Sequence, residues 1–265
     1  YTRLYGNDHL FWIENYLECE IHESNEAQGE IRKNIAGANF KAVDEVDPRA
    51  IGILSTWTYF NNPARWPQEI LKAHMAQVPK DRVRMFDQFA DTHALYKQQN
   101  YFDGRPWYFG VVYSFASDTY LHGDISVLER QFKEIARDPR ASQCVGYFPS
   151  EEALGHNHFL FQFMNRLGWN PGETGLRSFT EQYVRNRYGR EAEPVMRVAL
   201  DKLLATSYGP EGASRPLYWT RMGTDFDFTF LKDAGYRATL RGVIEQALRA
   251  ATLLRGNHLY LHDLN

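Results

Sequence analysis

The sequence predicts an α/β protein in which part of a barrel or sheet of parallel strands is followed by an all-α region. Up to Gly168, short apolar segments alternate with segments of helical periodicity, as expected of β-α-β units. Beyond Gly168 the pattern changes to long amphipathic segments. The chain has 265 residues, 43% of them hydrophobic, so a sizeable core can form. These observations predict two domains, at 1–170 and 171–265.

The first predicted domain alternates strands with helices along the chain. Its strand candidates are the opening segment 4–12 and residues 50–57, 82–89, 106–115 and 142–148. Its helices are predicted at 65–78, with Pro67 near the start, at 124–138, with Asp124 as a candidate N-cap, and at 156–169. Five strand candidates fall short of the eight strands that close a barrel.

The second predicted domain consists of helices and one aromatic loop. Residues 175–189, 191–209 and 236–264 have the periodicity of amphipathic helices. Residues 210–230 combine prolines and glycines with a cluster of Trp, Tyr and Phe, so an ordered loop is predicted there.

Composition excludes several function classes. The net charge of −3 provides no basic surface for nucleic acid, and no apolar run is long enough for a membrane span. The sequence contains no Gly-rich phosphate loop, Walker motif or dinucleotide fingerprint, so a nucleotide-dependent reaction is not predicted. Cys19 and Cys144 are too few for a disulfide framework and are interpreted as buried thiols.

Carboxylates and aromatic residues gather where the predicted strands end. In parallel α/β folds, reactive groups lie at the carboxyl ends of the strands. Glycoside hydrolysis needs one carboxylic acid that protonates the leaving oxygen and one carboxylate that attacks or activates water. One glutamate near residue 18 and one near residue 152 would supply this pair, although isomerases, aldolases and metalloenzymes also have acidic strand ends. The strand-end residues are Asp8, His9, Glu14, Glu18, Glu20, Glu23, Trp57, Asp87, Asp91, Tyr113, Asp118, Glu151 and Glu152.

Each of these residues also has a purely structural interpretation. The glutamates at positions 14–23 fit a solvated face, Trp57 fits a core, and Glu151 with Glu152 fits the acidic start of a helix. His156 and His158 suggest metal ligands, but an i,i+2 spacing on a helix points the rings apart. No metal and no cofactor are therefore predicted.

Five segments in order resemble the catalytic barrel of the α-N-acetylglucosaminidases, glycoside hydrolase family 89. They are YGNDH (5–9), LSTWTYF (54–60), WPQEILKAHMAQVPKDR (66–82), the segment from FDQFADTH to YLHG (86–123) and the segment from CVGYFPSEE to RLGW (144–169). The resemblance implies a partial (β/α)8 TIM-type barrel, the C-terminal part of a longer catalytic domain. It also implies a glycan or glycoside substrate, a two-glutamate retaining mechanism and an extracytoplasmic location.

The resemblance implies roles for individual residues. Glu152 falls on the family's nucleophile. Glu18, in Tyr-Leu-Glu, best fits the aromatic-x-Glu step that carries the acid/base, and Glu20 is the alternative in a register shifted by two. Trp57 corresponds to a tryptophan that stacks on the terminal sugar. Asp8, His9 and Tyr113 complete the predicted substrate-binding set.

The sequence also departs from the family pattern. The family's Pro-Glu-Gly at the nucleophile is Glu151-Glu152-Ala153, and its Asn-Phe-Gly-Gly-Asn is Ser-Phe-Ala-Ser-Asp at 114–118. Two alternatives therefore stay open: an α-glycosidase of other sugar specificity, and a carbohydrate-binding relic without activity. The family's first barrel strands are also absent, so we expect the chain to need them from the same or another polypeptide.

Overall fold

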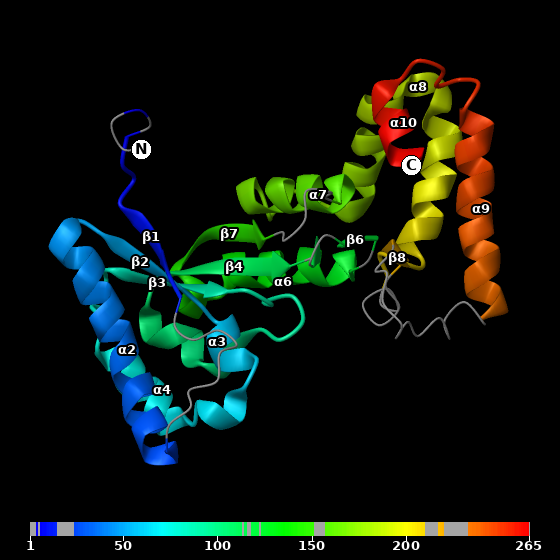
Figure 1. Ribbon diagram of the computed structural model, residues 1–265. Coiled ribbons are helices and arrows are strands. Elements are labelled where there is room, and N and C mark those ends of the chain that lie inside the picture. The colour runs from blue at the N-terminus through cyan, green and yellow to red at the C-terminus, as the bar shows by residue number, and fades with distance from the viewer. Residues whose placement is uncertain are drawn as a thin grey trace. The chain divides into compact units, whose positions relative to one another are not determined.

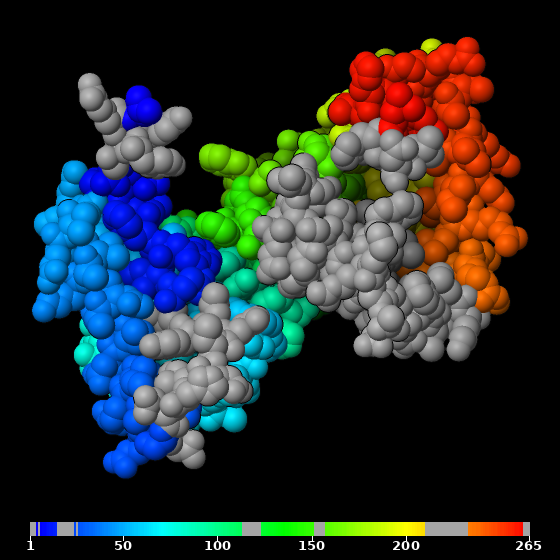
Figure 2. Space-filling view, viewed as in Figure 1, coloured from blue at the N-terminus to red at the C-terminus, as the bar shows by residue number. Residues whose placement is uncertain are grey.

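The computed structural model describes residues 6–14, 24–112, 123–150, 157–209 and 233–264, together with residue 4 and the strand residues 114–115, 118–121 and 217–219 (coloured in Figure 1; Figure 2 gives the space-filling view from the same side). The chain forms two compact units. The first comprises Tyr1–Val112 and Arg137–Ser150, and the second Tyr113–Ala136 and Glu151–Asn265. These units divide the chain at points other than residue 170, so the boundary near that residue stays a prediction.

The first unit is built on a parallel sheet whose strands occur in the order of the chain. Each strand pairs with the next one, and no strand order reversal occurs among the described residues (Figure 1). Strands added successively on one side are the arrangement of a singly wound barrel, whereas a doubly wound sheet reverses direction. The strands are β1 (Leu10–Ile13), β2 (Ile51–Ser55), β3 (Val83–Asp87), β4 (Trp107–Val112) and β7 (Cys144–Ser150).

The sheet is strongly curved, and its concave face carries an aromatic layer. The Trp12 ring on β1 lies 6.0 Å from the Phe148 ring on β7, although three strands separate β1 from β7. Phe86 lies between them, 5.3 Å from Trp12 and 4.8 Å from Phe148. One layer nearer the amino ends, Arg84 packs over the Tyr108 ring and donates to its hydroxyl. Contact between the two edge strands is what a barrel arc requires.

The convex face of the sheet is covered by helices and holds the main core of this unit. Tyr96 stacks on Trp107 with ring centroids 4.6 Å apart, and Phe102 packs on the same ring. Helices α2 and α4 lie side by side (Figure 1) and are joined by His74 Nδ1, 2.6 Å from the Arg32 carbonyl. The helices of this unit are α2 (Asn25–Val46), α3 (Trp57–Phe60), α4 (Gln68–Ala76), α5 (Leu95–Gln98), η1 (Pro63–Arg65), η2 (Asn100–Gly104) and η3 (Pro139–Ala141).

The second unit combines helices with a small antiparallel sheet. The strands β5 (Ser114–Phe115), β6 (Asp118–Leu121) and β8 (Leu217–Trp219) pair in that order. The Ile125 amide donates to the Tyr208 carbonyl at 3.1 Å, which joins the start of α6 to the end of α8. None of the described helices is long and apolar enough to cross a membrane. The helices are α6 (Ile125–Arg137), α7 (His158–Trp169), α8 (Leu176–Leu204), α9 (Ala234–Ala250) and α10 (His258–Leu264).

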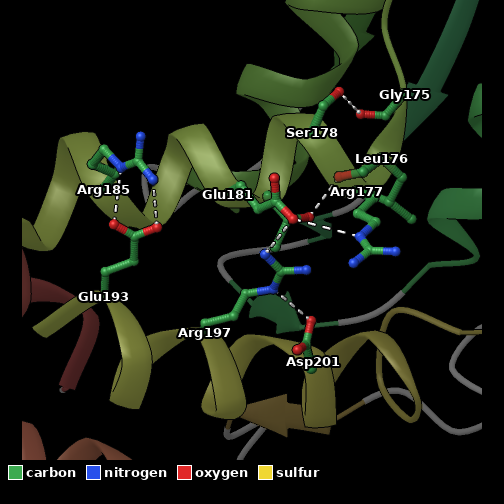
Figure 3. Close-up of polar contacts among 10 residues, drawn as sticks. Gly175, Leu176, Arg177, Ser178, Glu181, Arg185, Glu193, Arg197 and Asp201 are labelled. Carbon is green, nitrogen blue, oxygen red and sulfur yellow. Dashed lines mark hydrogen bonds and ion pairs between the residues drawn. The ribbon is translucent and has the colours of Figure 1, made fainter. Parts of the chain in front are cut away.

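Helix α8 folds back on itself at Gly189, where φ is 82° and ψ is 168°. Arg185 forms two hydrogen bonds of 2.9 Å with Glu193, eight residues away (Figure 3). Arg197 Nη1 lies 3.1 Å from Glu181 Oε1 across sixteen residues. A straight helix would separate such pairs by about 12 and 24 Å, so the two arms of α8 lie side by side.

The structure confirms the predicted strands and most of the predicted helices. The strand predictions at 50–57, 82–89, 106–115 and 142–148 overlap β2, β3, β4 and β7, and Asp124 caps α6 as predicted. The continuous helix predicted at 236–264 is wrong, because residues 251–257 form a turn between α9 and α10. The loop predicted at 210–230 lies mostly outside the described residues, and its residues 217–219 form β8. Helix α2 was not predicted.

Candidate active site

The candidate site lies at the carboxyl edge of the five-stranded sheet. Ile13 pairs with Leu54 at the ends of β1 and β2, so Glu14 and Ser55 come next in register. Trp57 begins α3 directly after β2, and Asp87 is the last residue of β3. Parallel strands bring these ends to one side of the sheet, as a TIM-type barrel requires of its reactive groups.

Glu14 is a half-buried carboxyl group at this edge. Its Oε1 accepts a hydrogen bond from the indole N–H of Trp12. Its Oε2 is buried and has no hydrogen-bond partner among the described residues. Burial raises the pKa of Glu14, and the hydrogen bond from Trp12 opposes part of this shift. Glu14 therefore releases its proton at a higher pH than an exposed glutamate does.

An aromatic cluster follows β2 and β3 at the same edge. Trp57 packs against Phe60 and Phe89 with ring centroids 5.6 and 5.0 Å apart. Phe60 lies 4.1 Å from the exposed His93 ring. Trp57, Phe60 and Phe89 are each half-exposed. Half-exposed rings at a strand edge provide apolar faces on which the C–H surface of a sugar can pack.

A polar network ties the ends of β2 and β3 together beneath these rings. Thr56 Oγ1 donates to Asp87 Oδ1 at 3.3 Å, and the Tyr96 amide donates to Asp87 Oδ2 at 2.7 Å. Ser55 donates to Gln88 and accepts from the Trp57 amide at 3.1 Å. Burial raises the pKa of Asp87 to about 7. With both oxygens bonded, Asp87 anchors the chain that carries Trp57.

The predicted catalytic residues lie outside the described residues. Glu18 and Glu20 follow β1 within residues 15–23, and Glu152 follows the end of β7 at Ser150 by two positions in the sequence. Tyr113, which directly follows β4, also lies outside them. Of the residues with a predicted role in catalysis or substrate binding, the described part of the chain places Trp57 at the carboxyl edge.

Asp8 and His9 lie at the opposite, amino end of β1. His9 adopts a positive φ of 62°, and its Nδ1 lies 2.5 Å from Asp47 Oδ2. This contact lowers the pKa of Asp47 to about 2, and Asn7 donates to the same oxygen at 2.9 Å. Asp8 accepts the Leu10 amide at 3.1 Å. These contacts join β1 to the end of α2, and the substrate-binding role of Asp8 and His9 stays a prediction.

The other candidates of the sequence have structural contacts. His158 contacts Tyr183 and Arg187 through Nδ1 at 3.3 and 3.2 Å, while His156 lies outside the described residues. Cys144 is half-buried and its thiol donates to the Gly146 carbonyl at 3.5 Å; burial raises its pKa. Within the described ranges, no group of three His, Cys, Asp or Glu residues could hold a metal ion.

The interpretation of Glu14 as part of a solvated face does not hold, because its carboxyl group is half-buried. The signal for this burial is local: Glu14 directly follows strand β1 and lies two residues after Trp12, whose indole N–H donates to the carboxyl group. Chemically, this edge offers a half-buried carboxyl group and an aromatic surface, and the sequence places further acids in the adjoining segments. This combination fits acid/base chemistry on a carbohydrate.

Comparison with known proteins points in the same direction. Residues 1–171 match the family model of the α-N-acetylglucosaminidase (NAGLU) TIM-barrel domain. Human α-N-acetylglucosaminidase is 24% identical over 212 residues, which are 78% of this chain and 28% of that protein.

Solved structures of a family 89 glycoside hydrolase from Clostridium perfringens share the fold. A variant with two glutamates replaced by glutamine, in complex with its substrate GlcNAc-α-1,4-galactose, gives a TM-score of 0.67 at 16% identity. The complex with 2-acetamido-1,2-dideoxynojirmycin gives the same values. Each alignment covers 96% of this chain and 28% of that one, so the chain spans just over a quarter of the length of its relatives.

Proposed function

The chain belongs to the α-N-acetylglucosaminidase family, and from this membership we propose that it forms part of a retaining, exo-acting α-glycosidase. The proposed reaction releases terminal α-linked N-acetylglucosamine from a glycan. The observation that carries the proposal is the family match over residues 1–171, which contain every predicted catalytic residue. The half-buried carboxyl and the half-exposed aromatic rings at the carboxyl edge of the sheet support it.

In the proposed mechanism Glu152 is the nucleophile. Its carboxylate attacks the anomeric carbon, an ester bond forms, and the glycosidic C–O bond breaks. A glutamate of the segment that follows β1 gives its proton to the leaving oxygen; the sequence nominates Glu18, with Glu20 as the alternative. The same residue then takes a proton from water, which attacks the anomeric carbon and releases the sugar with retained configuration.

The proposed substrate pocket is aromatic on one side. Trp57 would stack on the terminal sugar, and Phe60 and Phe89 extend its surface along the carboxyl edge. Ala116 and Ser117 replace the family's Gly-Gly pair, and Glu151 adds an acid beside Glu152. Both changes would alter the sugar specificity of the pocket. A panel of aryl α-glycosides with and without the N-acetyl group tests the specificity directly.

The proposed enzyme needs more strands than this chain supplies. The described sheet has five parallel strands, and a closed barrel has eight. Trp12 and Phe148, on the two edge strands, are 43% and 36% exposed, which fits a concave face completed by further strands. We propose that these come from the same or another polypeptide, and activity is to be measured with them present.

The nucleophile assignment has a direct test. In the full-length protein, Glu152→Ala should lower turnover of an aryl α-N-acetylglucosaminide by at least about a thousandfold, because no glycosyl ester can form. Glu151→Ala is the matched control and should keep most of the activity. Near-wild-type turnover of Glu152→Ala would refute the nucleophile assignment.

The departures around Glu152 favour one alternative function, a carbohydrate-binding relic of the same fold. Glu151 and Ala153 replace the proline and glycine that flank the nucleophile in the family. A relic would bind sugar by titration and release no monosaccharide. Trapping of a glycosyl adduct on Glu152 with a mechanism-based inhibitor excludes this alternative.

A further inference from the structure

We propose that Tyr59 and His74 are positioning residues, a buried hydrogen-bonded pair that holds Trp57 in the orientation in which it stacks on the terminal sugar. The inference rests on the proposed function and deepens it, because the two residues act on the substrate through Trp57 and do not touch it. All three belong to the first compact unit. Trp57 and Tyr59 stand on the short helix α3, and His74 stands on α4.

Helix α3 is too short to fix its own orientation. It has four residues, and a helix of this length does not form by itself in water. Its N-cap residue, Thr56, makes no side-chain hydrogen bond to the first turn. Contacts with the rest of the unit therefore hold α3 in place, and the direction of the Trp57 ring depends on them.

The two sides of α3 have different surroundings. Residues two apart on a helix are separated by about 200° around its axis, so Trp57 and Tyr59 point away from each other. Trp57 is half-exposed and contacts Phe60 and Phe89 at the carboxyl edge of the sheet. Tyr59 is buried against α4. A shift of Tyr59 on the buried side therefore turns Trp57 on the exposed side.

The hydrogen bonds of His74 run in one direction. Its Nδ1 lies 2.6 Å from the Arg32 carbonyl of α2, which can only accept, so Nδ1 carries the proton. Nε2 of the neutral ring is then an acceptor, and the Tyr59 hydroxyl, 3.0 Å away, donates to it. Burial lowers the pKa of His74 to about 4, so the ring is neutral at neutral pH. These two bonds tie α3 through α4 to α2.

The Trp66 ring encloses the pair. It meets the Tyr59 ring edge-to-face at 5.0 Å and the His74 ring at 4.9 Å. The Tyr59 and His74 rings are themselves edge-to-face, 5.6 Å apart. All three residues are buried, so water cannot readily replace the hydroxyl–imidazole bond. A buried bond without a replacement is costly to break, which makes the pair an effective anchor for α3.

The first test is Tyr59→Phe in the full-length protein. Phenylalanine keeps the packing of the ring and removes the hydroxyl. We expect KM for an aryl α-N-acetylglucosaminide to rise about three- to tenfold, the range over which one neutral hydrogen bond can shift a conformational equilibrium. We expect kcat to stay within about twofold, because Trp57 contacts the sugar in the ground state and in the transition state alike.

Tyr101→Phe is the matched control. The Tyr101 hydroxyl donates to Asp138 at 2.6 Å and joins η2 to η3 in the same unit. Its removal also costs a tyrosine hydrogen bond, but KM should stay within about twofold of the wild type. An unchanged KM in Tyr59→Phe, or an equal rise in both variants, overturns the inference and leaves the proposed function intact.

Combination with Trp57→Ala shows whether Tyr59 acts through Trp57. Trp57→Ala alone should raise KM, because the stacking surface is lost. In that background Tyr59→Phe should raise KM no further, since no ring is left to position. A further rise of the same size would mean that Tyr59 influences the substrate by another route, and it would contradict the inference. An unchanged KM in Trp57→Ala removes the stacking role, and the inference falls with it.

His74→Leu examines the other half of the pair. Leucine cannot accept the Tyr59 hydroxyl, so KM should rise as in Tyr59→Phe, and the double variant should resemble either single variant. Additive effects would contradict a shared hydrogen bond. Titration with N-acetylglucosamine gives the same comparisons as a Kd, so a protein that binds the sugar without cleaving glycosides refutes the proposed activity and still tests the inference. A wild type that neither binds nor cleaves overturns both.

Discussion

At the scale of single residues, buried carboxyl groups separate into two kinds by how many of their oxygens are bonded. Asp87 is fully buried, and the Thr56 hydroxyl and the Tyr96 amide satisfy one oxygen each. Glu14 has one buried oxygen that accepts no hydrogen bond from the described residues. The first arrangement ties two strand ends together, whereas the second leaves an atom available for chemistry.

Asp87 makes stability depend on pH in a predictable direction. Its pKa in the folded protein is about 7, above the ordinary value of 3.8 for an aspartate, so between these values the folded protein holds a proton that the unfolded chain has released. Stability is therefore lost as pH rises from about 4 to 7, by up to about 4 kcal/mol. Asp87→Asn should remove this loss, because its oxygen can accept from Tyr96 and its amide can donate to Thr56.

Urea unfolding of the full-length protein at several pH values measures the effect. Asp91→Asn is the control, because it removes a negative charge that raises the pKa of Asp87. In this variant the free energy of unfolding should still fall as pH rises, but the fall should be complete at a lower pH. An Asp87→Asn variant with the pH dependence of the wild type contradicts the prediction.

The residue-level predictions show what a sequence pattern can and cannot rank. Glutamates at 14, 18, 20 and 23 are indistinguishable by residue type, and the family resemblance nominates Glu18, with Glu20 as the alternative. The half-burial of Glu14 and its hydrogen bond from the Trp12 indole are tertiary facts that residue type does not reveal. Trp57, in contrast, was predictable because a strand end fixes it without an intervening loop.

At the scale of elements, backbone geometry at a few positions decides where helices end. Residues 100–103 are non-glycine residues with φ between 47° and 53°, a left-handed turn that L-residues adopt only under tertiary constraint. Buried Tyr101 and Phe102 hold this turn in the core. No local propensity predicts such a turn, because tertiary packing alone imposes it.

Gly189 is the position on which the fold-back of α8 depends. Its backbone angles lie in a region that is essentially restricted to glycine, and an added Cβ would meet no atom within 4 Å. Gly189→Ala should therefore destabilise the protein by about 1–3 kcal/mol through the backbone alone. Gly172→Ala, where an added Cβ also meets nothing and φ is not positive, is the matched control and should change stability by less than about 1 kcal/mol. Equal effects of the two substitutions in urea unfolding would contradict this.

Element predictions succeeded where periodicity was strong and failed where it was weak. Helix α6 and strands β3 and β4 are recognisable from their apolar spacing. Helix α2 is not, because Gly29 and Gly37 interrupt a polar segment. Gly37 has a packing reason: a Cβ there would lie 2.9 Å from Gln77 Cβ, so glycine lets α2 approach the end of α4. Only the cap at Ser24 signals this helix locally.

At the scale of the first unit as a whole, strand order and curvature together define the barrel. Alternating strands and helices predict a parallel sheet but leave open whether it is flat or curved. The curvature is visible in a pair of residues, Trp12 and Phe148, that no sequence pattern connects. In a flat sheet their strands would be about 19 Å apart.

This contact makes the curvature measurable in solution. In the full-length protein, Trp12→Ala and Phe148→Ala should be coupled in a double-mutant cycle by about 0.5–1.5 kcal/mol, the range of a packed aromatic pair. Trp12→Ala combined with Phe102→Ala, on the convex face, is the control and should be additive within about 0.5 kcal/mol. Because strands this far apart touch only on a concave surface, additivity in the Trp12–Phe148 cycle would mean a flat sheet.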